Sequence, residues 1–178
     1  MNLKKVFNFL LLLVLTSPCL AQTKDFTEEE EKNYNTIKSL FEHFKDKGYD
    51  SAQRDFVFKH FVYFDNVLAD TSKTQILKRT KFFDELFSQM IHYVDSVGME
   101  NLDAAPTRLF KDNPTFFKSF EAESDLNKFL PFTLTYYDKR RPREPIGVLL
   151  FEPKTHKLLT WILLNQGGYY YFLTFNLL

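Results

Sequence analysis

The side chains that most often carry chemistry in proteins are sparse in this sequence and follow no familiar catalytic pattern. The four histidines are His43, His60, His92 and His156. None is followed by a second histidine three or four residues later, which is the spacing of helical zinc motifs. His92 and Asp95 are three residues apart, which is typical of a surface pair on a helix. There is also no Gly-x-Ser-x-Gly nucleophile, phosphate loop or dinucleotide fingerprint. The sequence therefore assigns no catalytic residue, no metal ligand and no cofactor.

The C-terminal part of the chain offers a different kind of chemistry, which is the binding of apolar surfaces. Five residues there combine ring or methyl surface with one hydrogen-bonding group each. Mostly apolar binding sites usually contain a few polar groups placed in this way. The five are Thr135, Tyr137, Trp161, Tyr170 and Thr174. We predict that they line one face of a β-sheet and bind a ligand.

The sheet that would position these residues is predicted from four short segments with strand composition. They are residues 131–139, 146–152, 157–164 and 169–177, all rich in β-branched, aromatic or aliphatic side chains. Turn signals at 140–145, 153–156 and 165–168 separate them. Because short turns join antiparallel neighbours, the four segments predict an antiparallel meander.

The expected pairing sorts the side chains onto two faces, since neighbours along a strand point in opposite directions. The expected pairs are Phe151–Leu158, Val148–Trp161, Tyr137–Val148, Trp161–Phe172 and Leu163–Tyr170. One face is a predicted core: Phe132, Leu134, Tyr136, Leu149, Phe151, Leu158, Ile162, Leu164, Tyr169, Tyr171, Leu173, Phe175 and Leu177. The other, here called the mixed face, holds Thr133, Thr135, Tyr137, Val148, Leu150, Leu159, Trp161, Leu163, Tyr170, Phe172, Thr174 and Asn176. A solvated face would be more polar, so we expect helices, a second subunit or a ligand to cover it.

Residues 1–21 have the features of a secretory signal peptide. Lys4 and Lys5 precede an apolar run over residues 6–15, and small residues at positions 19 and 21 fit a cleavage site. The run is short for a stable membrane anchor. A retained membrane helix and lipidation at Cys19 are the two alternatives.

The composition of the expected mature chain, residues 22–178, restricts its function. The only cysteine is Cys19, so the mature chain has no disulfide and no thiol chemistry. Removal of Lys4 and Lys5 from a chain with 23 basic and 23 acidic residues leaves a net charge of about −2. Such a balance gives no electrostatic case for binding nucleic acid or an anionic membrane. We predict a single α+β domain that is secreted or periplasmic, with no membrane span.

Two amphipathic helices are expected before the sheet. The first begins at a capping box formed by Thr27 and Glu30 and ends at Gly48. The second covers residues 72–97, where apolar residues recur in steps of four and three. Its stripe consists of Ile76, Thr80, Phe83, Phe87, Met90, Val94 and Val97. Residues 49–69 mix helix and strand signals, and helix is the preferred interpretation.

The segment between the long helix and the sheet is irregular. Residues 107–110 are a candidate strand beside the main sheet, and Asn113 is a candidate cap of a short helix that begins at Pro114. The predicted fold class is therefore α+β, with N-terminal helices packed on a C-terminal four-stranded antiparallel meander. This layout resembles the NTF2-like and cystatin-like folds. The resemblance implies a pocket between sheet and helices, or a homodimer formed through the sheet.

Two functions are compatible with these features. The first is an exported, non-enzymatic binding module that uses the mixed face for a small apolar ligand or a protein partner. The alternative is a pocket enzyme of NTF2-like type whose catalytic groups meet only in the fold. The absence of a catalytic motif favours the first. An exposed apolar patch in the structure would support it further, whereas a closed cavity with an inward carboxylate or histidine would support the second.

Overall fold

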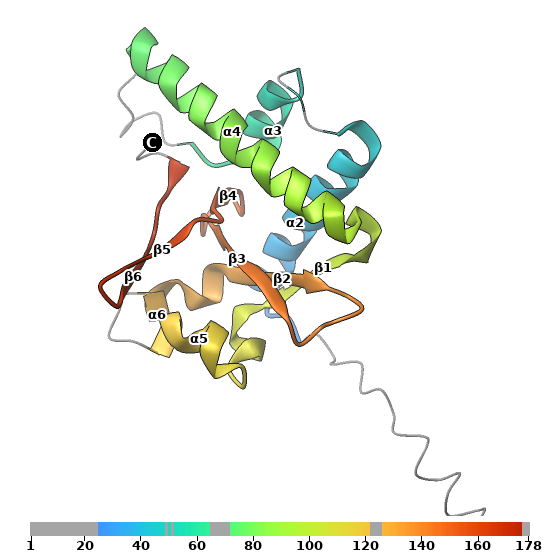
Figure 1. Ribbon diagram of the computed structural model, residues 1–178, viewed down its shortest axis with the longest axis vertical. Coiled ribbons are helices and arrows are strands. Elements are labelled where there is room, and N and C mark those ends of the chain that lie inside the picture. The colour runs from blue at the N-terminus through green and yellow to red at the C-terminus, as the bar shows by residue number, and fades with distance from the viewer. Residues whose placement is uncertain (1–24, 49, 51, 65–71, 122–125, 176–178) are drawn as a thin grey trace, which may run out of the picture.

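A four-stranded antiparallel sheet lies between two layers of helices (Figure 1). The computed structural model describes residues 25–48, 50, 52–64, 72–121 and 126–175. The expected signal peptide, Cys19, Asn176 and Leu177 lie outside these residues. The strands are β1 (Leu102–Pro106), β2 (Thr133–Asp138), β3 (Pro145–Phe151) and β4 (Leu158–Thr160), in that spatial order. The α+β class and the four-stranded antiparallel sheet are as the sequence predicts.

One face of the sheet is covered by α2 (Glu28–Lys47), α3 (Arg54–His60) and α4 (Lys73–Val97), as Figure 1 shows. The capping box at the start of α2 is confirmed, because the Glu30 amide donates to the Thr27 hydroxyl and the Thr27 amide to the Glu30 carboxylate. Gly48 ends this helix with φ at 65°, a conformation that glycine adopts at little cost.

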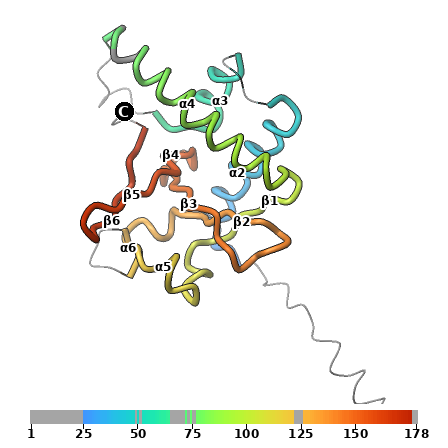
Figure 2. Tube along the Cα trace, in the orientation of Figure 1, coloured from blue at the N-terminus to red at the C-terminus, as the bar shows by residue number. Residues whose placement is uncertain are grey.

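The main core lies between this helix layer and the sheet. α4 has 25 residues and is about 38 Å long at the standard rise, and Figure 2 shows it crossing the layer from end to end. Phe83, Phe87, Met90 and Val94 of its stripe are buried. They meet the predicted core face of the sheet, since Leu134, Tyr136, Leu149, Phe151 and Leu158 belong to the same cluster.

Residues 49–69 contain both kinds of structure that their composition suggests. α3 confirms the helix over part of the segment, and Val62 then forms a parallel bridge with Leu158. The Tyr63 amide donates to the Leu158 carbonyl, and the Leu158 amide donates to the Phe61 carbonyl. The chain therefore extends the sheet beyond β4 for a few residues.

The second helix layer consists of the 3₁₀ turn η2 (Thr107–Phe110), α5 (Pro114–Glu121), α6 (Leu126–Phe129) and the 3₁₀ turn η3 (Leu130–Phe132). The expected strand at 107–110 is wrong, because β1 occupies the five residues before it. Asn113 caps α5 as expected, since its side-chain oxygen accepts from the Phe116 amide. Phe117, Phe120 and Leu126 pack with Val148, so this layer covers the mixed face.

The C-terminal segments depart from the expected meander. Residues 157–164 do not form one strand but two, β4 and β5 (Leu163–Gln166). β5 pairs with β6 (Tyr169–Phe172) as a separate two-stranded sheet, called here the β5–β6 ribbon. The fourth strand of the main sheet is instead β1, which pairs with β2.

A β-bulge explains why one face assignment fails. Phe151 lies opposite Leu158 as expected, but Leu150 lies opposite Thr160, so the register shifts between the two pairs. Leu159 is the extra residue, and it reverses the alternation of faces for the residues that follow. The expected pairs of Trp161 with Val148 and Phe172 are therefore wrong. Val148 lies opposite Thr135 rather than Tyr137, a shift of two residues that leaves the faces unchanged.

Candidate functional site

The structure separates the five residues predicted to bind a ligand. Trp161 lies with the main core, where its ring meets Phe87 edge to face at 4.7 Å and Phe175 at 4.8 Å between centroids. Tyr137 lies on the opposite face of the sheet, beside Ala105 and Phe110. No ligand can therefore contact both rings across one sheet face.

The remaining predicted residues are also divided. Thr135 is fully buried, and its hydroxyl donates to the Thr107 hydroxyl at 3.1 Å. Tyr170 packs beside Val148 under the second helix layer, whereas Thr174 is partly exposed near the end of the described chain. Side chains of α5, α6 and η2 fill the mixed face, so it is a second core.

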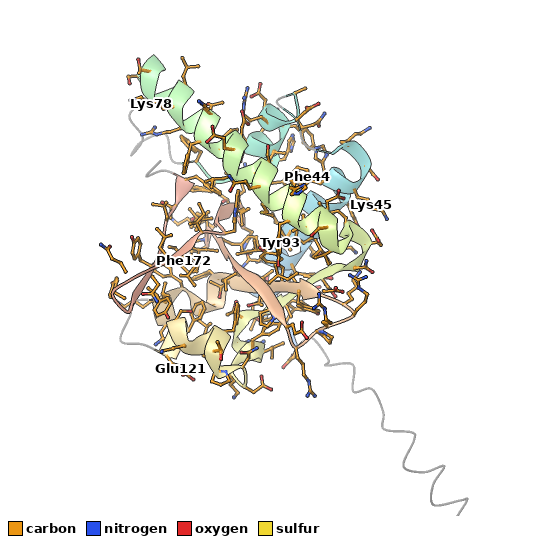
Figure 3. All side chains as sticks on the ribbon, in the orientation of Figure 1. Phe44, Lys45, Lys78, Tyr93, Glu121 and Phe172 are labelled. Carbon is orange, nitrogen blue, oxygen red and sulfur yellow. The ribbon has the colours of Figure 1, made fainter. Side chains whose placement is uncertain are left out.

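The β5–β6 ribbon is the most exposed apolar part of this region. It turns at Gly167 and Gly168, whose φ angles of 64° and 90° suit a two-residue hairpin turn. The pairs are Gln166 with Tyr169 and Leu163 with Phe172, two residues away from the expected register. Leu163, Tyr170 and Phe172 face inward onto the second core. Figure 3 shows Phe172 at the left of the view.

The outer face of the ribbon carries Leu164, Gln166, Tyr169 and Tyr171, which alternate with the inward residues. Tyr169 is 51% exposed, and its ring stacks beside that of Tyr171 at 6.4 Å. The sequence contains no charged side chain between residues 158 and 178. Among the described residues, β5 and β6 pair only with each other, so each presents an unpaired strand edge.

A cleft between α2 and β1 is the second candidate site, and the sequence gives no signal for it. It has a volume of about 250 Å³. One face of α2 forms one wall, and the other wall is β1 with the preceding 3₁₀ turn η1 (Met99–Asn101). The lining residues are Tyr34, Ile37, Lys38, Phe41, Glu42, Lys45, Met99, Glu100, Leu102, Asp103, Ala104 and Lys139.

Asp103 is the most constrained polar residue of this cleft. Its Oδ1 accepts from the Tyr34 hydroxyl at 2.9 Å and from the Ala104 amide at 2.8 Å. Its Oδ2 accepts from the Tyr137 hydroxyl at 3.5 Å, across the strand pair that places Tyr137 opposite Asp103. Burial, together with the Asp103 carboxylate, raises the pKa of Tyr34 to about 12 and that of Tyr137 further. Both phenols therefore keep their protons and hold the carboxylate in place.

Two ion pairs involve residues close in sequence to the cleft lining, although none of the four residues lines the cleft. Glu30 is only 2% exposed, and Arg108 donates to both of its carboxylate oxygens, at 2.8 and 2.9 Å. In the second pair, Arg140 donates to both oxygens of Asp138. The hydrogen bonds from Arg140 lower the pKa of Asp138 to about 2. The expected turn at 140–145 is thus held at its start to the end of β2.

Two of the histidines, His156 and His43, make contacts between different segments of the chain. His156 joins the β3–β4 turn to α2, with Nδ1 at 3.0 Å from the Asn33 side-chain oxygen and Nε2 at 3.5 Å from Glu29. His43 stacks on Phe56 at 4.5 Å between centroids. Among the residues that the structure describes, no three metal-binding side chains come together. None of the helices in the described parts of the chain is long and apolar enough to cross a bilayer.

Comparison with known proteins adds no assignment. No family model, no curated protein and no solved structure matches this chain. The resemblance of its layout to the NTF2-like and cystatin-like folds accordingly stays a prediction.

Proposed function

We propose that this protein is an exported, non-enzymatic binding module that recognises a protein partner through the outer face and open edge of the β5–β6 ribbon. The observation that carries the proposal is the exposure of Tyr169 on β6, which pairs with β5 on one edge and with no strand on the other edge among the described residues. Exposed apolar patches on single chains commonly mark interaction sites. Aromatic residues are also enriched where partners bind.

The edge itself favours an extended partner strand. Soluble proteins usually protect their edge strands with lysine, proline or a bulge, and β5 and β6 contain none of these. A two-stranded ribbon is also only marginally stable by itself. A partner strand that pairs with the ribbon would satisfy its open amides and carbonyls, as in other cases of strand addition.

The absence of charge admits a second copy of this chain as one such partner. An isologous contact brings the same residues together from both subunits, so a charged edge would place like charges opposite one another. Residues 158–178 contain no charge that would oppose such a contact. A homodimer and a different protein partner are both interactions of the same surface.

A photo-crosslinking experiment tests the proposal. Replacement of Tyr169 by p-benzoylphenylalanine, in the cells that produce the protein, should give a discrete covalent adduct with a protein. The matched control is the same replacement at Tyr93, which is 53% exposed on α4 (Figure 3) against 51% for Tyr169. An adduct of twice the chain's mass would identify a homodimer, and another mass would identify a different partner. Equal adducts at both positions, or none at Tyr169, would contradict the proposal.

A charge placed on the ribbon should remove the adduct. Leu164→Lys puts an ammonium on the outer face beside the Tyr171 ring, where desolvation on binding would be costly. We expect it to abolish crosslinking from position 169 without changing the melting temperature by more than a few degrees. The control Gln89→Lys, on an exposed position of α4, should leave the adduct unchanged.

A further inference from the structure

The α2–β1 cleft is remote from the ribbon and carries a different set of groups. Figure 2 shows the ribbon at the left edge of the view, with β1 and α2 to the right of the centre. The floor is apolar, because Ile37, Phe41, Leu102 and Ala104 are all buried. Three carboxylates and three ammonium groups surround it: Glu42, Glu100, Asp103, Lys38, Lys45 and Lys139.

Strand addition is not available in this cleft, although β1 is an edge strand. The Lys139 amide donates to the Asn101 carbonyl, so Leu102, Ala104 and Pro106 direct their backbone groups to the free edge. The Leu102 amide donates to the Met99 carbonyl and the Ala104 amide to the Asp103 carboxylate. Pro106 has no amide hydrogen. An occupant must therefore be bound by its ends and its apolar body rather than by backbone pairing.

The two ends of the cleft differ in charge and burial. Asp103 lies at the Tyr34 end, where the Tyr34 and Tyr137 hydroxyls hold it. Lys45 and Lys139 lie at the other end, beside η1, and Lys139 Nζ donates to the Glu100 carbonyl at 2.9 Å. An ammonium has three donors, so Lys139 can bind an anion as well.

We propose that this cleft binds a short apolar peptide with free termini, such as a dipeptide, with its ammonium at Asp103 and its carboxylate at Lys45 and Lys139. A cavity of about 250 Å³ suits a molecule of that size. Tyr34 lies eleven positions before Lys45 on α2. Lys139 lies two residues after Tyr137, the register partner of Asp103. An extended dipeptide separates its terminal charges by about 7 Å, and the flexible lysines close the remaining distance.

The rim of the cleft has three further charged residues, which are Lys38, Glu42 and Glu100. Lys38 and Glu42 are exposed residues four positions apart on α2, so water screens both charges. Glu100 is exposed beside the lysine end. Asp103 is the partly buried member of the set, so it supplies the stronger of the two terminal contacts.

Three matched probes test the proposal by calorimetric titration of the exported chain. They are Leu-Leu, its N-acetyl derivative, which lacks the ammonium, and its C-terminal amide, which lacks the carboxylate. The free dipeptide should bind best. Acetylation should weaken binding by about tenfold or more, since it removes a hydrogen bond between charged groups at a partly buried site. Amidation should weaken binding only a few-fold, because the lysines are exposed.

Two substitutions assign the ends. Asp103→Asn should bind the free dipeptide as weakly as the wild type binds the acetylated one. Lys45→Gln, on an exposed position, should weaken both the free and the acetylated dipeptide but not the amide. The control Glu121→Gln lies on α5, at the opposite side of the view from Lys45 in Figure 3, and should change nothing.

Several results of these titrations would contradict the proposal. Equal affinity for the three probes, or no binding at millimolar concentration, would overturn the proposal. So would an Asp103→Asn protein that folds and still discriminates against the acetylated probe. If Asp103→Asn does not fold, the Lys45→Gln titrations decide, since their pattern depends on an exposed side chain. Crosslinking at Tyr169 is a separate readout, and neither result depends on the other.

Discussion

The ribbon and the cleft each contain an edge strand, but only the edge in the cleft is covered by other groups of the protein. In the cleft, β1 is closed by its own Asp103 side chain, by η1 and by α2. In the ribbon, β5 and β6 have no such protection among the described residues. A protected edge can bind through charged side chains, whereas an open edge can bind through its backbone.

Charge makes the same distinction. The cleft has six charged residues on its rim, and the ribbon has none. Salt screens exposed charges over about 8 Å at physiological ionic strength, but it does not weaken apolar contacts. The two surfaces should therefore respond to different conditions and different substitutions. The predictions below test that independence, beginning with a residue that supports both.

The largest effect is expected from Phe87→Ala. Phe87 is fully buried and contacts both Phe44 of α2, at 5.5 Å, and Trp161, which precedes the ribbon, at 4.7 Å. Its removal should lower the free energy of unfolding by about 3–5 kcal/mol, because it leaves a cavity in a packed core. Denaturant melts measure this loss, and both binding activities should weaken together as folded protein is lost.

The control for this variant lies on the same helix. Lys81 is exposed and has only a long contact, 4.0 Å, to Glu85. Lys81→Ala should change the free energy of unfolding by no more than about 0.5 kcal/mol. Similar losses for the two variants would mean that α4 does not bury the stripe that contains Phe87.

The helices were predictable from sequence because their signals are local. The capping box of α2 spans four residues, and the stripe of α4 repeats every three or four. The two faces of the sheet were predictable up to the point where alternation holds. Alternation fails at Leu159, where the bulge moves Trp161 into the main core. The single extra residue at the bulge therefore places Trp161, one of the five predicted site residues, on the opposite face from the one predicted.

The rest was not predictable because it depends on contacts between distant segments. The Thr160 hydroxyl, at the end of β4, donates to the Leu173 carbonyl, thirteen residues away. Asp103 acquires its role from Tyr34 and Tyr137, which are 69 and 34 residues distant in sequence. No local pattern marks an aspartate in the segment 102–106 as different from any other. Exposure of the ribbon likewise follows from where the second helix layer ends.

The next largest effect is expected from Arg108→Met, which should damage the cleft and spare the ribbon. Burial raises the pKa of Glu30, but hydrogen bonds from Arg108 and Thr27 outweigh it and hold that pKa below its usual value. Loss of Arg108 leaves a buried carboxylate unpaired. Breaking a fully buried pair costs about 3–5 kcal/mol, and about 2–3 kcal/mol is expected here because Arg108 is 36% exposed.

Denaturant melts near neutral pH measure that loss. Arg143→Met is the matched control, since Arg143 is exposed and contributes only its backbone carbonyl, to Asn113. Glu30 lies in the first turn of α2, and α2 forms one wall of the cleft. The dipeptide should therefore bind more weakly to the Arg108→Met protein, while crosslinking at Tyr169 should persist. Loss of the crosslink with the cleft intact would reverse the assignment of the two regions.

A smaller effect, confined to the ribbon, is expected from Thr160→Val. The buried Thr160 hydroxyl donates to the Leu173 carbonyl at 2.6 Å and accepts from the Ile162 amide at 2.9 Å. Valine has the same shape but leaves both backbone groups without this partner, at a cost of about 1–2 kcal/mol. Hydrogen exchange should accelerate at the amides of Tyr169–Phe172 and stay unchanged in α2. Thr115→Val, on an exposed position of α5, should alter neither.

The smallest effect is a difference in pH dependence between the two regions, tested with Asp138→Asn. The pKa of Asp138 is about 2 in the folded protein, below the usual 3.8, because Arg140 hydrogen-bonds to the ionised form. A carboxylate with a lowered pKa adds stability above its usual pKa, and that stability disappears as the pH falls through the folded value. The wild type should therefore be more stable than Asp138→Asn near neutral pH, and the two should converge as the pH approaches about 2. Lys139, which follows Asp138, lies at the rim of the cleft, so dipeptide binding should weaken together with this loss of stability. The ribbon carries no charged side chain, so crosslinking at Tyr169 should be unchanged at mildly acid pH. Unfolding free energies measured from neutral to acid pH check the prediction, with Asp112→Asn at an exposed position as the control. A difference between wild type and Asp138→Asn that stays constant across this range would show that the Arg140 pair does not stabilise the turn.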